Sequence, residues 1–193
     1  MNTIAADLQV VTVKPGELNI SARPVALHTI LGSCLTVTMF SPRMHIGGIC
    51  HALLPHLRRG DPGGGKPAAG AAHDGRDEEF KYVDSAIKFM LESFSAYGVA
   101  EDEIEIKTFG GADMFESSGI PGGIVTVGAQ NIKMAGEFLE SRHLKIVNSD
   151  VGGREGRVLY FYTHTGECLV RRIINTGIYR AYLKKLYNNY NRY

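Results

Sequence analysis

The stretch LGSCLTVTMFSPRMHIGGICHALLP, Leu31 to Pro55, decides how the centre of this chain folds. Residues 35–40 alternate enough to form a strand, a proline turn follows, and residues 46–54 return as an apolar strand. The stretch therefore predicts an antiparallel hairpin. Because a hairpin brings the residues at its two open ends side by side, Cys34 and His51 can meet in space.

A cysteine beside a histidine is a pattern typical of nucleophilic catalysis, because the histidine can take the thiol proton. Gly32 and Ser33 let the backbone bend sharply before Cys34 and bring amides close to a substrate carbonyl. Adjacent strand residues point to opposite faces, so Cys50 should face the core if His51 faces a site. The spacing alone equally allows a buried hairpin with a core cysteine and a hydrogen-bonded histidine.

The composition predicts one globular domain over residues 1–193. The chain has 193 residues, 44% of them hydrophobic, which is enough to bury a full core. Lys and Arg number 21 against 20 Asp and Glu, so charge gives no reason to expect nucleic acid or an anionic membrane as a partner. Without an apolar targeting or spanning segment, and with only 3 cysteines, we expect a cytoplasmic protein with reduced thiols.

The rest of the chain predicts an α/β layered fold with many strands and two or three helices. Apolar residues recur at three- and four-residue steps in Glu78–Tyr97, and Gln130–Arg142 is a second predicted helix. We expect further strands at Leu8–Val13, Leu18–Ser21, Ile104–Phe109, Ile124–Val127, Leu144–Asn148, Arg157–Thr163 and Glu167–Ile174. Residues 56–77 are predicted to be a mobile loop, and residues 176–193 a basic, tyrosine-rich tail.

Two other kinds of site are not supported. The segment GDPGGGKP, Gly60 to Pro67, matches a phosphate-binding loop as far as Lys66, but a proline replaces the Ser or Thr that would bind magnesium. We also expect no metal, because the candidate ligands lack the short paired spacing of a zinc site: Cys50, His51, His56, His73 and Asp74.

Several motifs, kept in order over about residues 10–174, resemble the chemoreceptor glutamine deamidases, the CheD family of bacterial chemotaxis. The motifs are Leu31–Cys34, Gly47–His51, Leu53–Pro55, Lys107–Met114, Val127–Asn131 and Asp150–Arg157. The resemblance implies a layered sandwich of mixed or antiparallel sheets with flanking helices, similar to the catalytic domain of the cytotoxic necrotizing factor toxins. It implies hydrolysis of glutamine side-chain amides on methyl-accepting chemotaxis receptors, through a Cys thioester and without any cofactor.

The same resemblance implies roles for individual residues. Cys34 would be the nucleophile, His51 the general base and Thr29 the third member, although by the family's spacing His28 would stand at that third position. Residues expected to stabilise the oxyanion or bind substrate are Gly32, Ser33, Phe109, Gly110 and Gly111.

Other functions remain open at this stage. The protein could instead be a non-catalytic chemotaxis regulator that binds a receptor or a CheC-type phosphatase. An enzyme with the same pair of residues could also use an amine acceptor or cleave a methyl ester, because amide and ester cleavage pass through the same tetrahedral chemistry.

Overall fold

A computed structural model describes this chain over residues 8–56, 80–113 and 125–173. The expected loop beyond residue 56, the segment Gly60–Pro67 and the basic tail all lie outside these ranges. The described strands form two sheets. The four-stranded sheet has the order β1 (Val10–Thr12), β3 (Ala26–Leu31), β8 (Gly156–Tyr162) and β9 (Cys168–Ile173). The five-stranded sheet has the order β2 (Leu18–Ser21), β5 (Ile46–Ala52), β4 (Leu35–Ser41), β6 (Glu105–Gly110) and β7 (Ile146–Val151).

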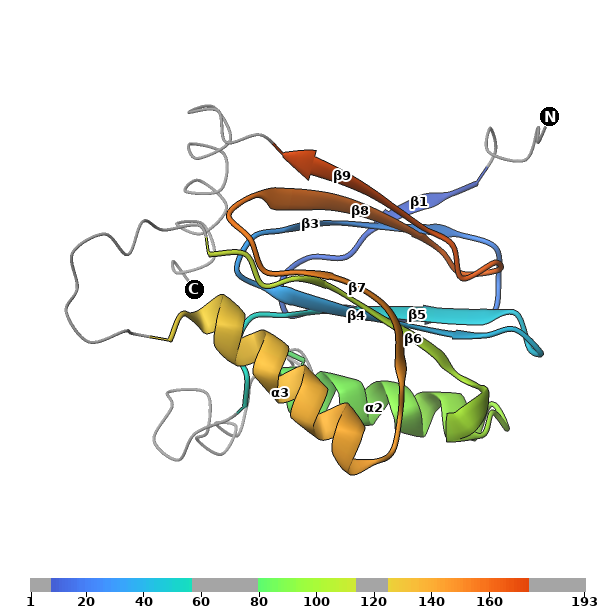
Figure 1. Cartoon of the computed structure of the whole chain (residues 1–193). Helices are drawn as coiled ribbons and strands as arrows, with labels where there is room; N and C mark the ends of the chain where they lie inside the picture. Colours follow the sequence, from blue (N-terminus) through green and yellow to red (C-terminus); the bar gives the residue numbers. More distant parts are fainter. Residues whose placement is uncertain (1–7, 57–79, 114–124, 174–193) are drawn as a thin grey trace, which may run out of the picture.

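The two sheets and a pair of helices form three layers. The helices are α2 (Val83–Ala96) and α3 (Val127–Ser141), and a short 3-10 turn, η1 (Glu101–Glu103), follows α2. Figure 1 shows the four-stranded sheet on one face of the five-stranded sheet and both helices on the other. Each sheet contains one parallel strand pair, β1 with β3 and β6 with β7, among antiparallel ones. The predicted α/β sandwich of mixed sheets with flanking helices is therefore confirmed.

The β4–β5 hairpin is buried on both faces because it lies in the middle layer. Every residue of both strands is buried. Val37 and Met39 pack in the apolar core under the helices, whereas Phe40 and Ile49 pack in a second core between the sheets. Successive side chains on a strand alternate between the two cores. This arrangement explains why the hairpin reads as a nearly continuous apolar run in the sequence.

Most predicted elements are confirmed, with three differences. Strand β3 was not expected, because its inward face carries Thr29 and its outward face carries Ile30, which blurs the alternation of polar and apolar residues. The strand expected at Leu144–Asn148 is β7, which begins at Ile146 and continues to Val151. Residues 125–127 are not a strand: α3 begins at Val127, and the Thr126 hydroxyl caps it by accepting a hydrogen bond from the Ala129 N–H at 3.3 Å.

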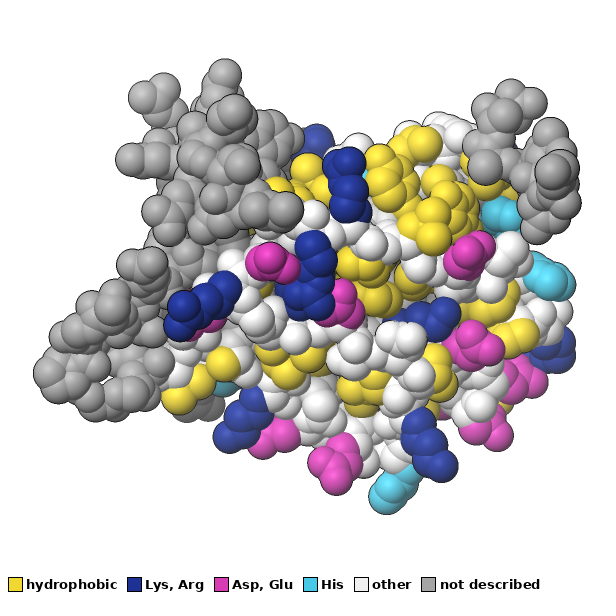
Figure 2. Space-filling view, turned by 45° about the horizontal axis from the view of Figure 1, so that its top comes forward, with side chains coloured by type: hydrophobic (Ala, Val, Ile, Leu, Met, Phe, Trp, Pro, Cys, Tyr) yellow, Lys and Arg dark blue, Asp and Glu magenta, His cyan; other side chains and the backbone are white. Residues whose placement is uncertain are grey.

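The outer face of the four-stranded sheet is open to solvent and carries several apolar side chains. Val10, Tyr160 and Leu169 are 57%, 36% and 50% exposed. Figure 2, in which this face is turned toward the viewer, shows the hydrophobic side chains gathered there. In the part of the chain that the structure describes, no helix is long and apolar enough to cross a membrane.

Candidate active site

Cys34 lies where the chain crosses from one sheet to the other. β3 ends at Leu31 in the four-stranded sheet and β4 begins at Leu35 in the five-stranded sheet, so the crossing is short. Gly32, Ser33 and Cys34 form a bend between these strands, and all three are partly exposed. Cys34 is therefore carried on a tight turn at the end of the sandwich and belongs to neither apolar core.

His51 lies on β5 and faces the space between the two sheets. It is paired with Thr36 of β4 in the hairpin. Its neighbour Cys50 packs in the core under the helices and is fully buried. The prediction that these adjacent residues face opposite sides of the sheet is confirmed.

Thr29 reaches across from the four-stranded sheet to His51. The Thr29 Oγ1 lies 2.7 Å from the His51 Nδ1 and donates a hydrogen bond to the Val13 carbonyl oxygen at 2.8 Å. Because the single hydroxyl proton points to that carbonyl, the imidazole must donate from Nδ1 to the hydroxyl oxygen. This tautomer leaves the Nε2 lone pair available, and Nε2 is buried without a hydrogen-bond partner among the described residues.

His28 faces the opposite side of β3 from Thr29. Its ring packs at a tilt against the ring of Tyr160 of β8, with centroids 4.7 Å apart, and burial lowers the pKa of its imidazole. Of the two candidates for the third position, Thr29 is therefore the one in contact with His51.

The hairpin register brings Cys34 and His51 to the same end of the β4–β5 pair. Thr36 is directly opposite His51, and Cys34 precedes Thr36 by two residues, which is one repeat of the pleat. No hydrogen bond joins the thiol to Nε2. Catalytic pairs are often loose without substrate, so this geometry is compatible with proton transfer after substrate binds.

Burial keeps both groups of the pair uncharged near neutral pH. Removal from water raises the pKa of the Cys34 thiol to about 11, although the residue's own backbone acts in the opposite direction. Removal from water also lowers the pKa of His51 to about 4, opposed by the nearby Val13 backbone. The site therefore rests as a neutral thiol and a neutral imidazole.

Residues at the end of β6 and directly after it form hydrogen bonds with the Cys34 turn. The Gly111 N–H donates to the Cys34 carbonyl oxygen at 2.7 Å, and the Ala112 N–H donates to the Gly32 carbonyl oxygen at 2.8 Å. Gly110 has a φ of 102°, and a side chain there would collide with the Cys34 carbonyl oxygen. Phe109 packs between the sheets and is only 3% exposed. The glycines at 110 and 111 thus contact the Cys34 turn directly.

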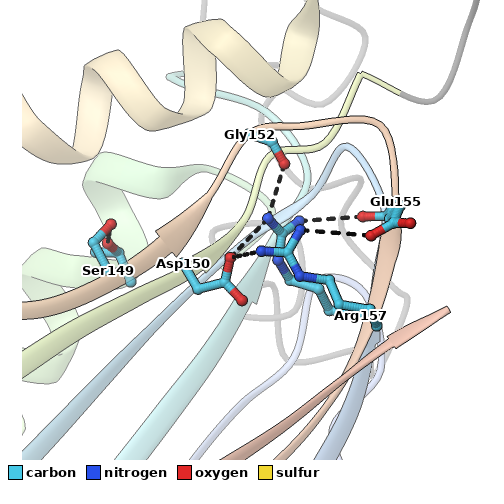
Figure 3. Close-up of polar contacts among 7 residues, drawn as sticks. Ser149, Asp150, Gly152, Glu155 and Arg157 are labelled. Carbon is cyan, nitrogen blue, oxygen red and sulfur yellow. Dashed lines mark hydrogen bonds and ion pairs between the residues drawn. The ribbon is translucent and has the colours of Figure 1, made fainter.

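An ion-pair network supports this end of the sandwich (Figure 3). The Arg157 guanidinium is 1% exposed and donates from Nη2 to Asp150 Oδ1 at 3.0 Å and to the Gly152 carbonyl oxygen at 2.8 Å. Arg172 donates to the same Asp150 oxygen at 2.6 Å. The Gly152 N–H in turn donates to the Gly110 carbonyl oxygen at 2.8 Å. The network therefore connects β8 to the turn that supports Cys34.

Sequence reasoning missed several residues around this site. Arg157 was named only in a motif and a predicted strand, yet its charge is buried against Asp150. Thr36 was not singled out, yet its hydroxyl is buried without a hydrogen-bond partner among the described residues. Asn131 stood in a quoted motif without a role, and its amide contacts the Cys34 turn.

The described part of the chain offers no obvious metal site. Within residues 8–56, 80–113 and 125–173, no group of three or more His, Cys, Asp or Glu side chains lies together in a way that could hold a metal ion.

Comparison with known proteins places these features in a family. The family model for CheD chemotactic sensory transduction matches residues 67–172. The chain is 40% identical over 167 residues to the probable chemoreceptor glutamine deamidase CheD 2 of Geobacter sulfurreducens, covering 86% of this chain and 91% of the relative. It is 34% identical over 169 residues to the probable chemoreceptor glutamine deamidase CheD of Maridesulfovibrio salexigens, covering 87% and 94%. The probable chemoreceptor glutamine deamidase CheD of Thermococcus kodakarensis is 30% identical over 151 residues, covering 78% and 84%. This chain belongs to the CheD family.

Proposed function

We propose that this protein is a chemoreceptor glutamine deamidase, which hydrolyses the side-chain amide of receptor glutamines to glutamate and ammonia. The names of the relatives support this activity and this substrate. The observation that carries the proposal is the contact between Thr29 and His51, which leaves a bare imidazole nitrogen at the end of the hairpin that also bears Cys34.

In the first step, Cys34 attacks the δ-carbonyl carbon of the glutamine while its proton passes to Nε2 of His51. Because the resting pair is neutral, the proton must leave during the attack and not before it. Thr29 supports this transfer by fixing the Nδ1–H tautomer and by accepting the N–H bond as the ring becomes positive.

Backbone amides of the Cys34 turn are suited to stabilise the oxyanion. The carbonyl oxygens of Gly32 and Ser33 accept hydrogen bonds from inside the protein. In a trans peptide the N–H lies opposite the C=O, so the amides of Ser33 and Cys34 point away from those donors. Losing one oxyanion donor in such a site costs about 2.7 to 4 kcal/mol of transition-state stabilisation.

The remaining steps return the enzyme to its starting state. The protonated His51 gives its proton to the departing amine, which leaves as ammonia and yields a thioester on Cys34. Water then attacks the thioester carbonyl while His51 accepts one of its protons. The C–S bond breaks, the thiolate recovers that proton, and glutamate is released.

Mass spectrometry of receptor cytoplasmic fragments tests the proposal. Wild-type protein should convert specific glutamines to glutamates, each with a gain of about one dalton, and Cys34→Ala should produce none. Conversion that survives Cys34→Ala would overturn the assignment of the nucleophile. The absence of product with both proteins would favour the non-catalytic regulator that binds a receptor or a CheC-type phosphatase.

A further inference from the structure

One side-chain amide connects the segments that carry Cys34 and His51. Asn131 lies on the buried face of α3 and is 0% exposed. Its Nδ2 donates to the Ser33 carbonyl oxygen at 3.2 Å and to the Leu53 carbonyl oxygen at 2.9 Å. Ser33 directly precedes Cys34, and Leu53 follows His51 by two residues. A single group thus bridges these two segments.

The chemistry of the contacts fixes the orientation of this amide. Carbonyl oxygens only accept hydrogen bonds, so the amino group of Asn131 must be the end that faces both of them. The other end, Oδ1, is buried and has no hydrogen-bond partner among the described residues. An unpaired buried acceptor is unfavourable for folding, whereas the two bonds from Nδ2 supply donors to the Ser33 and Leu53 carbonyl oxygens. The measurements below therefore separate the effect of this amide on catalysis from its effect on stability.

The start of α3 packs against the same turn that supports Cys34. A side chain at Gly128 would come within 2.5 Å of the Gly111 carbonyl oxygen, so only glycine allows the helix to lie this close. The Gly111 N–H in turn holds the Cys34 carbonyl oxygen. This close packing is what brings Asn131 within hydrogen-bond distance of the Cys34 turn.

We propose that Asn131 is a positioning residue for the Cys34–His51 pair. Its two N–H groups hold the ends of the hairpin so that the sulfur and Nε2 keep the separation that proton transfer needs. It acts through Ser33 and Leu53 and not by touching substrate. The inference rests on the proposed function for its activity measurement, but a second measurement on Cys34 itself does not depend on deamidation.

Two variants remove one or both donors while keeping the side chain's approximate size. Asn131→Leu lacks polar atoms, and Asn131→Asp keeps the shape but donates at most one hydrogen bond, when it is protonated, in place of the amide's two. Both should lower kcat for deamidation about a hundred-fold while KM stays within about two-fold, because a misplacement near 1 Å is costly in chemistry. If Asn131→Leu does not fold, thermal unfolding will show it and Asn131→Asp carries the test.

Leu139→Ala is the matched control. Leu139 lies two turns further along the same buried face of α3 and is 1% exposed. Its truncation should lower the melting temperature through a cavity while leaving kcat unchanged. A fall in kcat equal to that of the Asn131 variants would show that loosening the helix suffices, and would overturn a specific role for the amide.

Alkylation of Cys34 by iodoacetamide gives the second measurement. The sulfur displaces iodide, the thiol proton leaves to the nearby base, and peptide mass spectrometry locates the product on Cys34. His51→Ala and Asn131→Leu should each slow the reaction, and the double variant should be no slower than His51→Ala alone. Additive effects, or a rate unchanged by Asn131→Leu, would overturn the proposal.

The two measurements separate the positioning role from the proposed function. Non-additive alkylation without any deamidation by wild-type protein would support the positioning role and overturn the deamidase proposal. If wild-type protein deamidates and both folded Asn131 variants keep kcat within about two-fold, the deamidase proposal stands and the positioning role is overturned.

Discussion

The two faces of the β4–β5 hairpin differ sharply in chemistry although they belong to the same strands. The face under the helices is closed by apolar side chains such as Val37 and Met39, and its Cys50 is fully buried. The face toward the other sheet carries His51 and Thr36, whose buried Nε2 and Oγ1 have no hydrogen-bond partners among the described residues. The first face contributes stability, and the second retains unpaired polar atoms that a folding requirement does not explain.

The largest expected effect is a loss of deamidation on substitution of Cys34 but not of Cys50. Cys34→Ala should reduce deamidation to background, because the proposed nucleophile is lost. Cys50→Ala should keep kcat and lower the stability of the fold, because it removes only a buried apolar contact. Initial rates and thermal unfolding check both. Loss of activity in folded Cys50→Ala would contradict the division between the two faces.

The second largest expected effect is a fall in kcat when the contact between Thr29 and His51 is removed. Thr29→Val should lower kcat by about a hundred-fold or more, because the tautomer of His51 is no longer fixed. Thr38→Val, at another buried threonine whose hydroxyl lies 3.9 Å from the Cys168 sulfur, is the matched control and should keep kcat. Steady-state kinetics of the two variants make the comparison. Equal rates for the two variants would contradict the proposed catalytic role of Thr29.

Acid should destabilise the fold because His51, on the hairpin face toward the four-stranded sheet, is buried in its neutral form. The pKa of His51 is lowered to about 4 from 6.5, so between these pH values the unfolded state binds the extra proton. His51 therefore destabilises the fold as the pH falls from 6.5 to 4, by on the order of 3 kcal/mol at about 1.4 kcal/mol per pKa unit. Urea unfolding at a series of pH values should show a shallower decline in His51→Asn. Parallel curves for the two proteins would contradict the buried, neutral imidazole.

The smallest expected effect is a change in stability when Thr36 is substituted. Its hydroxyl has no partner among the described residues, so Thr36→Val should raise the free energy of unfolding by about 1 kcal/mol and leave kcat unchanged. Chemical unfolding and kinetics measure the two quantities. A clear fall in kcat would instead place this hydroxyl in the reaction.

Local patterns in the sequence were enough to predict the β4–β5 hairpin and the opposite faces of Cys50 and His51. They could not indicate that β3 lies in the other sheet, because pairing between distant strands leaves no local pattern. The contact between Thr29 and His51 depends on that pairing, so neighbour spacing along the chain could not decide between His28 and Thr29. Asn131 likewise acts through backbone carbonyls far away in sequence, which no side-chain motif reveals.

Nitrogen-15 NMR of the His51 side chain tests the central claim most directly. At neutral pH the ring should be uncharged, with its proton on Nδ1 and a bare Nε2, and it should titrate at about pH 4. Thr29→Val should disturb this tautomer. A proton on Nε2 at neutral pH, or a ring that titrates near 6.5, would contradict the account of how these two sheets hold the proposed general base at the same end of the hairpin as Cys34.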